Sequence, residues 1–316
     1  MADHRIALAL ALLTAALPWT ASSVAQTLPP HDPLRILIVS DEVNPHGLPP
    51  EQLTQPGDLS AALAGVAALN IDGTAESLLE IPTNQIEEAT TRLLVSPDDA
   101  AGYDVLIYFA HRTPDNGVDD QARQEAFVAA VAQFLGAGGG VISFHHGIYE
   151  SPGKSSMQDL LGGQASGAVP WNTTEGQNVI AVSAHHFVSH HAVLYPAART
   201  YADASLGIPS ASYPAFNNTP DERYPNLALR AGTSGIEVLF ASDYNEGGAT
   251  HLLGYQRTQA QWNGVVVVYQ PGEYQPHALG SGDNNFQILL NAIVYAANFR
   301  FDDWIHIDGF EGGSGP

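Results

Sequence analysis

The sequence of 316 residues contains no cysteine and few basic side chains. The lack of cysteine excludes disulfides and thiolate nucleophiles, so stability must come from the core or from a bound ion. Lysine and arginine total 11 against 33 acidic residues, which gives a formal net charge of −22, and Lys154 is the only lysine. Because phosphate binding requires basic side chains, no nucleic-acid partner is expected.

Several nucleotide-binding and hydrolase motifs are also missing. There is no G-x-S-x-G elbow, no Walker loop, and no G-x-G-x-x-G after the first apolar run. The glycine-rich stretch "GAGGGV" at 136–141 precedes an apolar run, which is the wrong side for a phosphate cradle. Neither a cysteine nor a serine nucleophile is therefore expected.

The first 25 residues have the pattern of a secretory signal. A basic start at His4 and Arg5 leads into the apolar run "IALALALLTAALPW", and the small residues Ser23 and Ala25 precede a cleavage point. The apolar run is shorter than the ~20 residues of a membrane span. We expect cleavage before Gln26, a periplasmic or secreted protein, and no membrane attachment after cleavage.

The rest of the chain predicts one α/β domain over 34–300, after a proline-rich leader at 26–33 and before a C-terminal extension at 301–316 whose glycine-rich end is loose. Short apolar runs at 35–40, 103–111 and 140–146 have the composition of buried strands. A helical pattern over 119–140 joins the last two and makes them a parallel βαβ unit. We expect a three-layer sandwich with a mostly parallel sheet, and the hairpin-like second half allows antiparallel strands at one edge.

Histidines and carboxylates follow all three of these runs. His46 follows the first run, His111 and Arg112 follow the second, and His145 and His146 end the third. Ligands of an open parallel sheet bind beyond the carboxyl ends of its strands, so these residues are expected in one crevice. Neighbouring residues of a strand point to opposite faces. If the strand runs through the pair, one histidine faces the pocket, and His145 is favoured.

Two further groups supply candidate ligands. The segment "SAHHFVSHHAV" at 183–193 places His185 and His190 where they could bind a metal, or else forms a polar loop with one functional histidine. The second group consists of acidic, aromatic and histidine side chains of other segments: Trp171, Glu222, Glu273, Tyr274 and His277. A carboxylate beside histidines can act as a base, orient an imidazole or bind a metal.

Together these stretches resemble the ThuA-like (trehalose utilisation) family of the class I glutamine amidotransferase-like superfamily. The resemblance rests on "RILIVS" with a following histidine, "YDVLIYF", "FVAAVAQFLGAGGGVISFHHG", "LLGG", the histidines of 185–191, "DERY" and "LLNAIVYAA", and it covers most of 34–300. It implies a flavodoxin-like sandwich and a role in carbohydrate metabolism, with oxidised disaccharides among the substrates. Amidotransferases of the superfamily carry a cysteine nucleophile where this chain has its histidine pair. The chain departs from the family at Gly272-Glu273, where Gly-His is usual, with His277 four residues on.

Two functions from different classes are consistent with this sequence. The first is an exported hydrolase or lyase that acts on a small or oligomeric carbohydrate, with His145, His146, His111 and Glu273 as catalytic groups. In that interpretation His46, Arg112, Trp171, Glu222 and Tyr274 bind substrate, and His185, His190 and His277 could hold zinc, manganese or calcium. The second is a non-catalytic protein that captures a sugar or a metal ion in the same crevice. An enzyme needs at least two titratable groups close to one reacting atom, whereas a binding protein needs only hydrogen-bond donors and aromatic faces. The convergence of titratable groups therefore distinguishes the two functions.

Overall fold

The fold is seen in a computed structural model of the chain. It describes residues 30–41, 58–66, 77–111, 121–167, 169–172, 177–183, 185–218, 221–244, 252–272 and 284–300, with the backbone alone given for 58 and 169–172.

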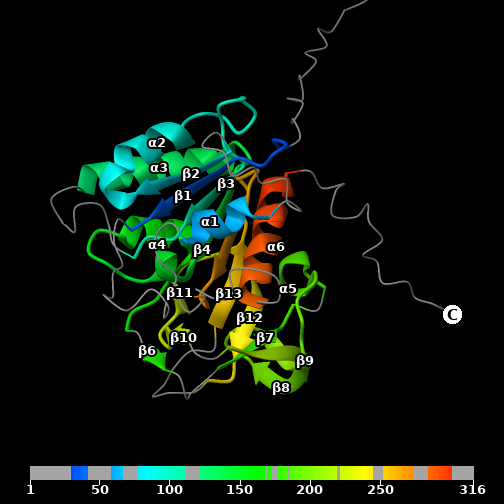
Figure 1. The fold of residues 1–316 in the computed structure, drawn as a ribbon. Coiled ribbons are helices and arrows are strands. Elements are labelled where there is room, and N and C mark those ends of the chain that lie inside the picture. Colours follow the sequence, from blue (N-terminus) through cyan, green and yellow to red (C-terminus); the bar gives the residue numbers. More distant parts are fainter. Residues whose placement is uncertain are drawn as a thin grey trace, which may run out of the picture.

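A ten-stranded sheet forms the centre of the molecule (Figure 1). Its first half, in the order β2-β1-β3-β4-β14, is parallel throughout and consists of β2 (Leu78–Pro82), β1 (Ile36–Ser40), β3 (Val105–Tyr108), β4 (Gly140–Phe144) and β14 (Val266–Tyr269). The second half continues from β14 as β13 (Leu252–Arg257), β12 (Ile236–Ser242), β7 (Gln177–Ala181), β9 (Ile208–Asn218) and β8 (Ala197–Asp203). All pairings in this half, including β13 with β14, are antiparallel.

The predicted mixed α/β class is confirmed, but the sheet is not mostly parallel. Four of its pairings are parallel and five are antiparallel. One reason is that three pairs of consecutive strands, β8 with β9, β12 with β13 and β13 with β14, are joined by connections too short for a crossover, so their members must run in opposite directions. The hairpin pattern expected at one edge therefore extends over half of the sheet.

Helices cover both faces of the sheet. Alternate residues of β1 divide between two cores: Ile36 and Ile38 belong to one, Leu37 and Val39 to the other. The first core includes α1 (Asp58–Ala64), α5 (Phe187–His190) and α6 (Asn284–Asn298). The second includes α2 (Ile86–Leu93), α3 (Gln121–Gly136) and α4 (Ser155–Leu161). No helix within the described ranges is both long and apolar enough to cross a membrane.

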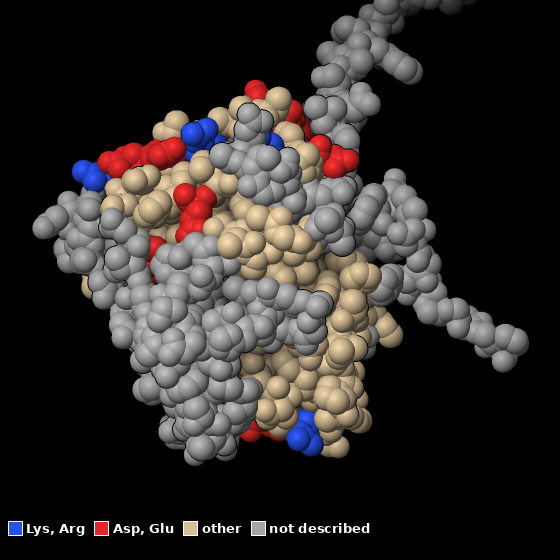
Figure 2. Space-filling model, in the orientation of Figure 1, with Lys and Arg blue, Asp and Glu red and all other residues tan. Residues whose placement is uncertain are grey.

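Short elements complete the fold outside the main sheet. They are the 3-10 turns η3 (Thr83–Gln85) and η6 (His145–Ile148), the pair β10 (Asp221–Arg223) with β6 (Val169–Asn172), and the pair β11 (Ala228–Leu229) with β5 (Gly163–Gln164). Acidic side chains gather over α2 on the face shown in Figure 2, where basic side chains are few.

The glycine run before β4 allows the helices to pack closely. A Cβ atom at Gly139 would lie 2.2 Å from the ring of Phe134 in α3, and one at Gly140 would lie 2.5 Å from the Cβ of Ala296 in α6. The run therefore brings β4 into contact with helices on both faces. The predicted βαβ unit is confirmed, because α3 lies between β3 and β4 in the sequence and the two strands pair in parallel.

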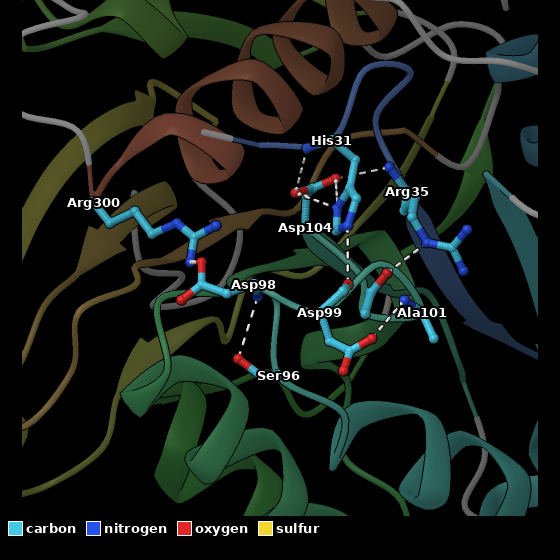
Figure 3. A network of polar contacts seen from close by, with 9 residues as sticks. His31, Arg35, Ser96, Asp98, Asp99, Ala101, Asp104 and Arg300 are labelled. Atoms are coloured by element: carbon cyan, nitrogen blue, oxygen red, sulfur yellow. Dashed lines mark hydrogen bonds and ion pairs between the residues drawn. The ribbon is translucent and has the colours of Figure 1, made fainter. Parts of the chain in front are cut away.

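A network of polar contacts joins distant parts of the chain at the amino ends of the parallel strands (Figure 3). The buried carboxylate of Asp104 accepts hydrogen bonds from the backbone N–H groups of His31, at 3.0 Å, and Arg35, at 2.8 Å, and lies 3.1 Å from His31 Nδ1. Nearby, Arg300 beyond α6 contacts Asp98 at 2.7 Å. Burial raises the pKa of Asp104, an effect that the two N–H groups oppose. The carboxylate therefore anchors the start of β1.

Asp104→Asn should lower the free energy of unfolding by about 1–3 kcal/mol, because an amide NH₂ would then face backbone N–H groups that need an acceptor. Urea unfolding of both forms measures the loss. Asp99→Asn, which removes the same charge from an exposed side chain and keeps an oxygen acceptor for the Ala101 N–H, should cost less than about 1 kcal/mol. Equal losses in the two variants would contradict the anchoring role of Asp104.

Candidate functional site

The carboxyl ends of the parallel strands bring polar residues to one edge of the sheet. Asp41 follows β1, His111 comes soon after β3, His145 follows β4 and Gln270 follows β14. Strand β2 lies on one side of β1 and β3 on the other, so the strand order reverses at this point. Asp41 Oδ2 accepts a 2.8 Å hydrogen bond from the backbone N–H of His111 across that position.

The backbone turns sharply at the histidine pair. Strand β4 ends at Phe144, His145 has a φ of 39°, and η6 begins at once. A positive φ is uncommon for a residue with a side chain. The premise that the strand runs through both histidines is therefore wrong, and the two rings lie on the same side with their centroids 4.6 Å apart. Gly147 permits the turn, because a Cβ there would lie 2.2 Å from the Tyr108 carbonyl oxygen.

Glu222 from β10 joins the two histidines in a buried cluster. One nitrogen of His145, one nitrogen of His146 and one carboxylate oxygen of Glu222 all lie within 4.8 Å of one another. His145 Nε2 and Glu222 Oε2 lie 3.3 Å apart. Asp221 lies beside Glu222 in β10 and accepts a 2.9 Å hydrogen bond from its backbone N–H. The side chains of His145, His146 and Glu222 thus present lone pairs to a common point.

A hydrogen bond to the backbone fixes the orientation of the His145 ring. Its Nδ1 atom lies 2.6 Å from the carbonyl oxygen of Gln270, which can only accept, so Nδ1 carries the proton. In the neutral ring Nε2 then keeps its lone pair, which faces Glu222 and can accept a hydrogen bond from the Tyr224 hydroxyl at 3.2 Å. A ring held in this way is prepared to act as a metal ligand or as a base.

Aromatic side chains and a third histidine surround the cluster. The ring of Phe109 stacks on His146 with 5.2 Å between centroids, and His111 meets the same ring edge-on at 5.2 Å. Tyr149 stacks on His111 at 5.3 Å and also contacts Tyr224. His111, His145 and His146, which were predicted to share a crevice, therefore lie together.

Other predicted site residues lie elsewhere or outside the described residues. His46, Arg112, Glu273, Tyr274 and His277 fall outside them, as does the side chain of Trp171, whose backbone belongs to β6. His185 precedes α5 and His190 ends it. Neither belongs to the cluster, and the described residues place no third ligand beside them. His190 Nδ1 instead contacts the Ser189 hydroxyl at 2.7 Å, a local contact within α5.

The sequence interpretation did not select Tyr224, Gln270 or Lys154. Tyr224 lies within "DERY", and Gln270 follows an apolar run just as the histidines do, so position alone could have identified both. Lys154 is buried, and its Nζ donates to the carbonyl oxygens of Ala110 at 2.9 Å and His146 at 3.0 Å. Burial lowers its pKa to about 7. The sequence could have drawn attention to Lys154 because it is the only lysine.

A small cavity lies near Lys154 but apart from the cluster. Its volume is about 20 Å³, and its walls include Tyr108, Gln124, Met157 and Lys154. Such a space suffices for a water molecule and not for a sugar. The histidine–glutamate cluster is therefore the stronger candidate for chemistry.

Lys154→Met should lower the free energy of unfolding by about 1–3 kcal/mol, because it leaves the buried carbonyl oxygens of Ala110 and His146 without this donor. Chemical denaturation measures the change. Arg92→Met removes the same charge from an exposed i,i+4 pair on α2 and should change stability by less than about 0.5 kcal/mol. An unfolding midpoint for Lys154→Met equal to that of the unsubstituted protein would contradict the assigned role.

Comparisons with known proteins give distant likenesses. No family model matches the chain. No curated protein matches it either. A solved structure described as ThuA-like, from Bacteroides uniformis, is 15% identical, covers 85% of this chain and 93% of its own, and has a TM-score of 0.46. A cytoplasmic protein from Salmonella typhimurium is 12% identical over 83% of this chain and 99% of its own, with a TM-score of 0.43.

A larger enzyme is also similar over part of its length. A β-galactosidase from Bacillus circulans is 9% identical, covers 84% of this chain but 31% of its own, and has a TM-score of 0.42.

Proposed function

We propose that this chain is an exported carbohydrate-active enzyme whose site at the carboxyl rim of the sheet uses a divalent metal held by His145, His146 and Glu222. The observation that carries the proposal is the convergence of their three ligand atoms within 4.8 Å. The cluster is buried, and burying a carboxylate is costly unless it is paired with a cation or with donors. A divalent ion would compensate the charge of Glu222.

The donor set fits a transition metal, and one pair of donors has the spacing that such an ion requires. Two ligands about 2.0–2.2 Å from a tetrahedral ion lie roughly 3.4 Å apart, and His145 Nε2 and Glu222 Oε2 are 3.3 Å apart. Two imidazoles and one carboxylate suit zinc or manganese, whereas calcium prefers oxygen ligands. The hydrogen bond from His145 Nδ1 to a backbone carbonyl is the usual support of a metal-binding imidazole.

The surrounding residues suit proton transfer on a polar substrate. When bound, a divalent metal would stabilise negative charge on a substrate oxygen. The imidazole of His111 and the hydroxyl of Tyr224 flank the cluster and can move protons, which hydrolysis or elimination at a glycosidic bond requires. Elimination from an oxidised sugar needs a base for the proton next to the carbonyl, and His111 is assigned that role.

The carbohydrate substrate is inferred from two features. The sequence resembles the ThuA-like family in the segments that build this site, "GGGVISFHHG" and "DERY". Tyr149 and Tyr224 lie beside the histidines, and aromatic rings of this kind can stack on sugar faces. We assign a modified or oxidised sugar, such as a keto-glycoside, as the substrate class.

His145→Asn and Glu222→Gln should each reduce metal binding and lower activity by two or more orders of magnitude. Asparagine is chosen at 145 because it tolerates the positive φ there. The measurements are metal content by mass spectrometry and turnover of plain, uronic and 3-keto glycosides, with and without EDTA. His185→Asn is the matched control and should retain both properties.

Full turnover of a glycoside after metal removal would exclude the metal from the mechanism. Stoichiometric metal or sugar binding with no turnover of any glycoside would favour the non-catalytic binding protein.

Export should leave a mature chain that begins at Gln26, because the small residues Ser23 and Ala25 occupy the positions that a signal peptidase recognises. N-terminal sequencing of material from the periplasm or the culture medium provides the check. Exported protein that retains Met1 would contradict this proposal.

A further inference from the structure

Asp221 forms a buried connection between the strand that carries Glu222 and the chain beyond β14. Its Oδ1 accepts the 2.9 Å hydrogen bond from the Glu222 N–H described above, and its Oδ2 accepts one from the Gly272 N–H at 2.9 Å. The side-chain NH₂ of Asn218 donates to the same Oδ2 at 2.7 Å. A single carboxylate thus holds the backbone on both sides of the cluster.

Gln270 makes a second connection between the same two segments. Its side-chain Nε2 donates to the backbone carbonyl of Glu222 at 3.1 Å, and its own backbone carbonyl accepts from His145 Nδ1 at 2.6 Å. The Gln270 side chain is fully buried, so water does not compete for this contact. Gln270 therefore contacts one candidate ligand with its backbone and another with its side chain.

These contacts close a ring. The path runs from Glu222 through Asp221 to Gly272, back along the chain to Gln270, and through its carbonyl to His145, which faces Glu222 again. We propose that Asp221 and Gln270 are positioning residues that fix the separation between His145 Nε2 and Glu222 Oε2. The inference rests on the proposed metal site and assigns its geometry to residues that touch no metal.

The ring is attached to the rest of the fold through amide side chains. Asn285 at the start of α6 donates to Asn218 Oδ1 at 2.7 Å, and the Tyr269 hydroxyl donates to Asn285 Oδ1 at 2.6 Å. Tyr269 is the last residue of β14 and directly precedes Gln270. The network therefore runs from Tyr269, the last residue of β14, back to Gln270 and Gly272 just beyond that strand. A shift of β10 relative to β14 would break several of these buried hydrogen bonds at once.

Asp221→Asn tests the carboxylate with little change in shape. An amide has one acceptor oxygen, so one of the N–H groups of Glu222 and Gly272 would face an NH₂ group. The affinity for Co²⁺, titrated into the metal-free full chain and followed by its visible absorption, should fall by about 10–100-fold. The absorption spectrum of bound Co²⁺ should also shift, a change that a merely stabilising residue would not cause.

Gln270→Met tests the other connection. It removes the donor to the Glu222 carbonyl but keeps the backbone carbonyl that orients His145, so affinity should again fall by about 10-fold or more. Asp99→Asn is the matched control for the lost charge, because Asp99 is exposed and lies in the segment 98–104 at the amino ends of the parallel strands, the edge of the sheet opposite the cluster. It should bind Co²⁺ as the unsubstituted protein does.

The outcomes separate the two proposals. If the unsubstituted protein binds no Co²⁺, the metal site itself is wrong. If it binds Co²⁺ and both Asp221→Asn and Gln270→Met bind with unchanged affinity and spectrum, the positioning role is overturned. Should Asp221→Asn fail to fold, Gln270→Met decides alone, and unchanged binding there overturns the proposal.

Discussion

The hydrogen bond from His145 Nδ1 to the carbonyl oxygen of Gln270 links the two strands on which the site depends. β4 and β14 are neighbours and run parallel, so their carboxyl ends reach the same edge of the sheet. The bond needs a ring that turns back from the end of β4, and the φ of 39° at His145 provides that direction. One strained residue thus brings His145 and His146 together, where an extended strand would have separated them.

Strands β1, β3 and β4 of the parallel half were predictable from the sequence because they are short and apolar, whereas β2 was missed because its residues are mostly only partly buried. The runs at 35–40, 103–111 and 140–146 correspond to β1, β3 and β4, and the residues that follow the last two lie in the site. The number of antiparallel strands was underestimated, because the sequence predicted them at one edge only. Its strands β8 and β9 alternate exposed and partly buried residues of mixed polarity, so no apolar run marks them, and their partners are decided by loop length and packing.

The composition of the site was harder to predict than its location. His111, His145 and His146 were found because they follow strands, a local property of sequence. Glu222 was named as a substrate-binding residue, but its approach to His145 depends on β10, a three-residue strand whose placement is set by long-range contacts with β6 and Gln270. The positive φ at His145 was not predicted, because glycine is the usual residue at such a turn and position 145 is a histidine.

The polar network around Asp104 places both ends of the described chain on one side of the molecule (Figures 1 and 3). His31 and Arg300 lie close to the segment 98–104, at the amino ends of the parallel strands, while the histidines lie at their carboxyl ends. The chain therefore enters and leaves the described part of the fold at the edge of the sheet opposite the cluster. A fusion partner joined directly before His31 or after Arg300 would be attached at that opposite edge.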